Sequence, residues 1–195
     1  MIDQFEVLDR ILTAVGAEPT EPPMKYSTRD ESRSVGILAV PDCPQRGITT
    51  WATIGASTFE TPVRRQDDLP IRVEFVAAVD ARLENFAVSV SACAFALGAD
   101  VRVGPGTIYR DVVSPIHPAT TTPHLFSVPP FVWANEFESI EGDDAYITWL
   151  QLVPITDDEA AFAAERGSDA LGEVFMKTQP DFFSFERVSA LLPEA

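Results

Sequence analysis

The chain has 195 residues, of which 46% are hydrophobic and 23% are charged, and its formal net charge is −16. This composition is typical of a globular chain and excludes disorder as the main state, and the length predicts one domain. The negative charge excludes a general attraction to nucleic acid or to an anionic membrane surface. The first residues lack the basic and apolar blocks of a secretory signal, and no apolar run could span a membrane, so we expect a cytoplasmic protein.

The first half of the chain predicts two helices and three strands. Apolar residues at helical spacing predict a helix over residues 2–15 that ends at Gly16, followed by a Pro-rich loop over residues 18–34. The apolar positions of that helix are Ile2, Phe5, Leu8, Ile11, Leu12 and Val15. A second apolar stripe predicts a helix over residues 83–97. The expected strands cover residues 35–40, 48–54 and 71–77.

The second half contains many turn-forming residues. Pro and Gly exclude a helix over residues 99–135, and short strands are expected near 107–109 and 125–128. A longer strand is expected over residues 145–153 and a last one over 185–191.

Two helices are expected between those last strands. Residues 156–159 have the Thr-x-x-Glu pattern of a capping box, which predicts a helix that ends near Arg166. Ser168 can cap a short helix over residues 169–176. The order of elements predicts an α+β (mixed α/β) domain with a central, mostly antiparallel or mixed sheet flanked by helices. Residues 1–34 are expected to belong to the same domain as residues 35–195.

The chain offers no catalytic or metal-binding constellation that stands out by spacing. Asp157, Asp158 and Glu159 could bind a hard cation, but the start of a helix explains all three. His117 and His124 match no metal-ligand spacing. Ser57 could be combined with either histidine as a nucleophile and base, although the G-x-S-x-G pattern is absent. We therefore expect no cofactor and no metal.

The two cysteines are far apart in the sequence. Cys43 and Cys93 have no CxxC spacing, and Cys93 falls in an apolar helix. We expect two free thiols, one in a loop and one in a helix.

The acidic residues are concentrated in the last third of the chain. Residues 136–195 carry 14 acidic and 3 basic groups, so they account for −11 of the net charge of −16. Five of them fall within nine residues and are expected to have no nearby cation, namely Glu136, Glu138, Glu141, Asp143 and Asp144. The aromatic residues beside them are Phe131, Trp133 and Phe137. This segment is either a solvated loop or a surface that attracts a basic protein, with Trp133 as an aromatic anchor.

Several segments, in order, resemble the suppressor of fused family. The sequence TTWATIGASTF at residues 49–59 is similar to a strand of that family with a T-x-G-x-S core, and IRVEF at 71–75 resembles its R-x-E-L strand. Residues 104–133 are similar to its PGT…I…PP stretch, WLQLVPITDDE at 149–159 resembles its strand–Pro-Ile-Thr–helix segment, and ERGSDAL at 165–171 resembles the helix–Gly–helix that follows. Phe75 stands where Leu is commoner, and the Pro-rich loop at 115–130 is a further departure.

This resemblance implies a mixed α/β domain without enzymatic activity. Short bacterial members of the family resemble immunity proteins, which neutralise toxins of polymorphic toxin systems. The chain is therefore expected to be a protein-binding immunity protein whose partner is a basic toxin domain, in a toxin–antitoxin arrangement. The alternatives are a small hydrolase that uses Ser57 or a histidine in a loop-lined pocket, and a structural or assembly domain.

Overall fold

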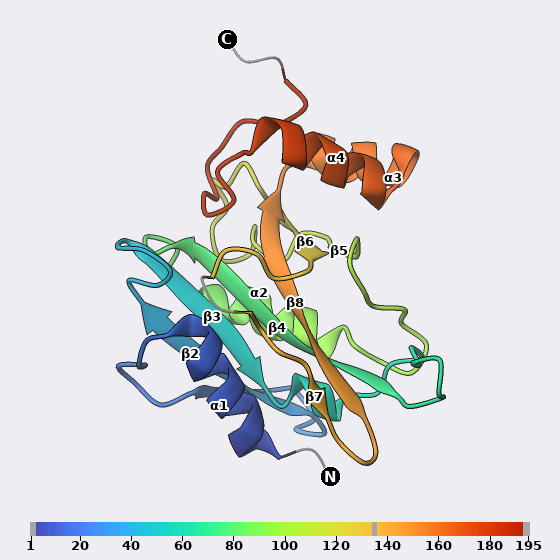
Figure 1. Ribbon diagram of the computed structural model, residues 1–195. Coiled ribbons are helices and arrows are strands. Elements are labelled where there is room, and N and C mark those ends of the chain that lie inside the picture. Colours follow the sequence, from blue (N-terminus) through green and yellow to red (C-terminus); the bar gives the residue numbers. More distant parts are fainter. Residues whose placement is uncertain (1–2, 134–135, 193–195) are drawn as a thin grey trace.

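The computed structural model describes residues 3–133 and 136–192. One eight-stranded sheet forms its centre, with four α-helices packed around it (Figure 1). The helices are α1 (Gln4–Val15), α2 (Phe86–Phe95), α3 (Asp157–Arg166) and α4 (Ser168–Thr178), and a short 3-10 helix, η1, covers Ala56–Thr58. The strands are β1 (Met24–Ser27), β2 (Ser34–Pro41), β3 (Ile48–Ile54), β4 (Ile71–Asp80), β5 (Ile108–Tyr109), β6 (His124–Val128), β7 (Ile140–Glu141) and β8 (Tyr146–Ile155).

The sheet is mixed, as the sequence predicts. Its strand order is β1-β2-β3-β4-β8-β6-β5, and β7 pairs with the first residues of β8 beside β6. Every pairing is antiparallel except that of the two central strands, β4 and β8, which run parallel from Ile71↔Tyr146 to Ala77↔Leu152. β8 is therefore a central strand, and its side chains belong to the hydrophobic clusters on both faces of the sheet.

Alternating side chains of the two central strands supply both faces of the sheet. Val73, Phe75, Ala77 and Val79 of β4 pack in one cluster with α2, whereas Val76 and Ala78 pack in another with α1. On β8, Leu150 and Leu152 belong to the α2 side. Ile147 and Trp149 pack on the α1 side, and Val153 and Ile155, on the same face, pack under α3 and α4. Thus α1 and the α3–α4 pair cover two ends of one face, and α2 covers the other face.

Local signals explain where the helices begin and end. Asp3 caps α1 by accepting a hydrogen bond from the Phe5 amide, and Gly16 ends it with φ +67°. The capping box of α3 is confirmed, since Thr156 and Glu159 exchange both hydrogen bonds. The expected cap at Ser168 is wrong: α4 begins at Ser168 itself, and no side chain caps it.

Three further expectations were wrong in detail. α1 buries Val7, Ile11, Ala14 and Val15, so Phe5 lies outside the stripe and is 82% exposed. The Pro-rich loop contains β1, whose side chains are not buried and so give no apolar alternation. Residues 185–191 do not form a strand, although burial alternates from Phe185 to Ser189, because their carbonyls accept hydrogen bonds from Thr120 and Thr121 instead of from a strand.

Within the described residues no helix is long and apolar enough to cross a membrane.

Candidate functional site

The acidic segment, residues 136–144, lies over the face of β8 that also carries α1. β7, inside this segment, pairs Ile140 with Ile147 of β8. The indole Nε1 of Trp149 donates a 3.0 Å hydrogen bond to the carbonyl of Glu138. The five carboxylates that the sequence singles out, Glu136, Glu138, Glu141, Asp143 and Asp144, are all exposed. The segment is therefore anchored by its backbone and presents its charges to solvent.

Glu138 and Glu141 form ion pairs with arginines from distant parts of the chain. Arg10 of α1 donates to Glu138 at 2.6 Å, and Arg65 donates to Glu141 at 2.7 Å. Arg65 also binds Asp67, and these two carboxylates raise the pKa of its guanidinium. The expectation that the segment lacks nearby cations is thus wrong for Glu138 and Glu141. Such exposed pairs contribute little to stability, but they reduce the local negative charge.

Trp133 belongs to the core and not to the exposed surface. It is 8% exposed, and its Nε1 donates a 3.0 Å hydrogen bond to the hydroxyl of Thr50 on β3. Its ring packs edge-on against Phe137, with ring centroids 4.9 Å apart. An anchor reached by a partner must be exposed, so Trp133 does not have that role in this structure. Phe131, two residues earlier, is 52% exposed.

Ser57 is a structural residue, which disfavours the hydrolase alternative. It is fully buried, and its hydroxyl donates a 2.6 Å hydrogen bond to the Glu74 carboxylate. Glu74 is also fully buried and accepts further hydrogen bonds from the Thr53 hydroxyl and from the amides of Gly55, Ala56 and Ser57. Burial raises the pKa of Glu74, and the hydrogen bonds from Ser57 and Thr53 oppose that rise. The two motifs T-x-G-x-S and R-x-E therefore meet in one buried network.

The two histidines make separate contacts, and neither reaches Ser57. His124 is buried; its Nδ1 accepts from the Asp111 amide at 2.9 Å, so its Nε2 carries the proton that faces Asp157 at 3.1 Å. The ring of His117 packs edge-on against Phe185.

The carboxylates at the start of α3 point to different partners. Asp157 faces His124, whereas the buried Glu159 pairs with Arg187 at 2.6 Å. No cluster of three potential metal ligands occurs in the part of the chain that the structure describes.

Both cysteines are buried free thiols, as the sequence predicts. Burial raises the pKa of Cys43 and, more strongly, that of Cys93. Because the thiolate is the reactive form, we expect neither thiol to react with a disulfide reagent in native buffer, and both to react after denaturation. Thiol titration with and without guanidinium measures this, and rapid labelling of the native protein would contradict it.

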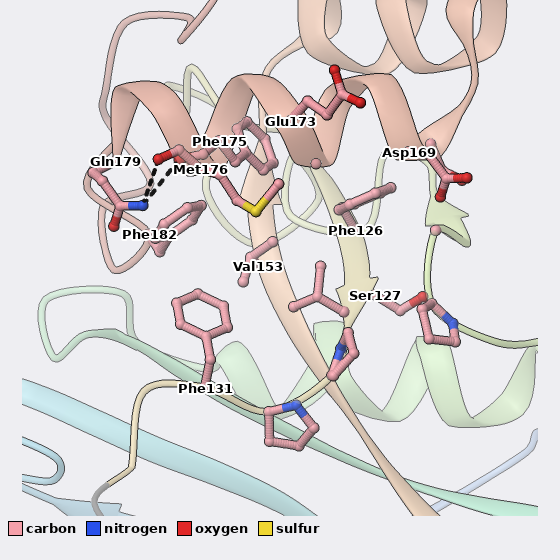
Figure 2. Close-up of a pocket in the computed structure, with 17 residues that line it drawn as sticks. Phe126, Ser127, Phe131, Val153, Asp169, Glu173, Phe175, Met176, Gln179 and Phe182 are labelled. Carbon is pink, nitrogen blue, oxygen red and sulfur yellow. Dashed lines mark hydrogen bonds between the residues drawn. The ribbon is translucent and has the colours of Figure 1, made fainter.

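A groove that the sequence does not reveal lies between α4 and residues 128–131 (Figure 2). It encloses about 620 Å³. Its floor is apolar and includes Phe126, Val153 and Phe175, all of which are buried. Phe131 and Met176, which is 70% exposed, form its lips. Figure 2 shows their side chains and that of Phe182 directed toward the same space beneath α4.

Four phenylalanine rings line this groove in a continuous series. Neighbouring rings are packed edge to face, with centroids 6.2 Å apart for Phe126–Phe175, 5.4 Å for Phe175–Phe182 and 5.2 Å for Phe182–Phe131. This arrangement suits aromatic rings, whose edges are positive and whose faces are negative. The series joins β6, α4 and two loops, so pairwise spacing in the sequence gives no signal for it.

Comparison with known proteins finds relatives of this chain both in sequence and in fold. Residues 31–188 match the family described as Suppressor of fused protein (SUFU). The chain is 33% identical over 182 residues to the immunity protein YqcF of Bacillus subtilis (strain 168), and the match covers 93% of each chain. A suppressor of fused homologue from Neisseria gonorrhoeae FA 1090 has a similar fold, with a TM-score of 0.64 at 15% identity over 98% of both chains. A chain of the Sufu–Fu complex also gives a TM-score of 0.64, at 11% identity over 96% of this chain and 91% of that one.

Proposed function

Because the chain belongs to the suppressor of fused family, we propose that it is an immunity protein that binds and neutralises a toxin in the cytoplasm. The observation that carries the proposal is its 33% identity, over nearly the whole of both chains, to a protein named as an immunity protein. The burial of Ser57 and the separate contacts of the histidines support a mode of action by binding and not by catalysis.

We further propose that the toxin domain is basic and that the acidic segment attracts it. Glu136 and Asp143 are exposed and form no ion pair within the described residues. Unpaired surface carboxylates on a chain with a net charge of −16 raise the rate of encounter with a cationic partner, and salt screens that attraction.

A growth assay tests the proposed function. The toxin domains encoded beside the gene are expressed in bacteria with and without this chain. We expect this chain to restore growth against one of them, and the purified pair to form a complex. An unrelated acidic protein of similar size is the control. If the folded chain protects against none of these domains, the immunity role is contradicted, and a stable homo-oligomer without a partner would favour the assembly alternative.

Charge reversal tests the acidic segment separately. In Glu136→Lys/Asp143→Lys, we expect the association rate with the toxin domain to fall about tenfold or more at low salt, and the difference to shrink as salt rises. Stopped-flow mixing at several ionic strengths measures it.

The matched control is Glu84→Lys/Asp100→Lys. These exposed residues flank α2, on the other face of the sheet. An equal loss of rate in both double variants would mean that net charge alone matters, and would contradict the assignment of the segment.

A further inference from the structure

We propose that the groove beneath α4 is the anchoring site for the partner, and that it receives an aromatic or long aliphatic side chain flanked by lysine or arginine. This inference rests on the proposed function, because it names the chemistry of the toxin segment that would dock there. It concerns a different surface from the acidic segment, and the residues that carry it lie on β6, β8, α4 and the loops at 129–131 and 182.

The groove has the apolar depth that an anchor side chain needs. Its floor residues Phe126, Val153 and Phe175 belong to the buried cluster under α3 and α4, so the floor is part of the packed core. Its lips, Phe131 and Met176, are among the most exposed large apolar side chains in the molecule. Aromatic anchors in such pockets dominate the energy of many interfaces, and methionine adapts its shape to what it contacts.

Gly172 keeps the groove open. It lies in the interior of α4, where glycine is among the least favourable helix residues, and it lines the groove. A Cβ built at this position would meet no atom within 4 Å. The structure therefore does not require glycine here for packing. A larger side chain would project into the free space, which makes Gly172 the position at which the groove can be filled without disturbing the core.

The negative charge around the groove favours a partner in which a cationic residue lies next to the anchor side chain. Asp169 and Glu173 stand on α4 at its rim, both are exposed, and neither forms an ion pair among the described residues. No lysine or arginine lines the groove; Lys177, one turn after Glu173, is the cation that α4 carries nearby. A second copy of this chain would bring two acidic rims together, so complementarity favours a basic partner.

The groove and the acidic segment are consecutive along β8. Trp149 donates a hydrogen bond to the carbonyl of Glu138 in the acidic segment. Gln151, two residues further along β8 on the same face, accepts a 3.0 Å hydrogen bond from the Phe131 amide. Val153, the following residue on this face, is part of the groove floor. Alternate residues of one strand lie on one face, so one partner can contact both surfaces at once.

Two small probes of matched shape test the groove directly. These are the 3-phenylpropylammonium ion and 3-phenylpropionate, titrated into protein labelled with ¹³C at the methionine methyl groups. Met176 reports on the groove, and Met24 on β1, at the far edge of the sheet, is the internal reference. We expect the cation to shift the Met176 signal with millimolar affinity, the anion to bind about tenfold more weakly, and Met24 to stay unchanged.

Variants locate the binding. Gly172→Leu should weaken cation binding about tenfold, whereas Ala92→Leu, at an exposed position of α2, should leave it unchanged. Asp169→Lys/Glu173→Lys should remove the preference for the cation. Phe131→Ala is a second groove variant in case the leucine disturbs α4. The proposal is overturned if Met176 does not respond, if the anion binds as well, or if the groove variants bind like the wild type.

The toxin itself separates this inference from the proposed function. A toxin domain neutralised in the growth assay should dissociate at least tenfold faster from Gly172→Leu than from Ala92→Leu. Neutralisation that is intact in Gly172→Leu would overturn the anchoring role and leave the immunity function standing. Probe binding without any neutralised toxin would contradict the proposed function, and with it the assignment of the groove to a toxin.

Discussion

Replacing Glu74 by Gln is expected to lower the free energy of unfolding by about 1–3 kcal/mol, and replacing it by Leu to cost more than twice as much and to prevent folding in cells. The carboxylate accepts five hydrogen bonds. Three of the donors are backbone amides that have no other acceptor among the described residues. An amide NH₂ at the position of either oxygen would face at least one backbone N–H of residues 55–57. With Leu, all three amides lose their acceptor in the core.

Urea unfolding of the wild type and the variants measures this cost. Glu84→Gln, the same change at an exposed glutamate, is the control and should change stability by less than about 0.5 kcal/mol. A Glu74→Gln variant as stable as this control would contradict the assigned role. The result would also explain why the T-x-G-x-S and R-x-E segments resemble the family: they hold β3, η1 and β4 together rather than perform chemistry.

The sequence predicts those parts of the fold that depend on neighbouring residues. The capping box at Thr156–Glu159 needs only four consecutive residues, and the central strands show their burial through apolar runs. β1 could not be predicted in this way, because its hydrogen bonds to β2 hold it in place while three of its four side chains are exposed and only Tyr26 packs partly against the core. Residues 185–191 show the opposite case: burial alternates as in a strand from Phe185 to Ser189, but the backbone carbonyls there bond to Thr120 and Thr121, which lie in a loop.

The candidate surfaces depend more strongly on contacts that are remote in the sequence. The acidic residues 136–144 could be identified from composition, and they are exposed, yet Arg10 and Arg65 reach them from 128 and 76 residues away. Trp133 was misplaced because an aromatic beside charged residues suits a core edge as well as an interface. The groove could not be predicted at all, since its walls meet only after β6 pairs with β8 and residue 182 returns beneath α4.

Arg187 is expected to be the other residue whose loss strongly destabilises the protein. Its guanidinium forms a bidentate pair with Glu159, at 2.6 and 2.7 Å, and donates to the carbonyls of Pro154 and Val188. Glu159 caps α3 by accepting from the Thr156 amide, and it also accepts from the Ala190 amide. The last described segment is thereby fixed to the start of α3 by one buried ion pair.

Arg187→Ala should therefore lower the free energy of unfolding by about 3–5 kcal/mol, because it leaves the Glu159 carboxylate buried without a cation. Glu159→Gln/Arg187→Ala should cost less than Arg187→Ala alone, since the Gln oxygen can still accept from Thr156 and no charge is buried. Urea unfolding of the three proteins measures the difference, with the exposed Arg46→Ala as the control. If the double variant is the less stable of the two, the buried charge is not the cause. Because residue 182 lies in the same segment and lines the groove, hydrogen exchange in Arg187→Ala should also show that groove wall loosened, while β2 and β3 stay protected.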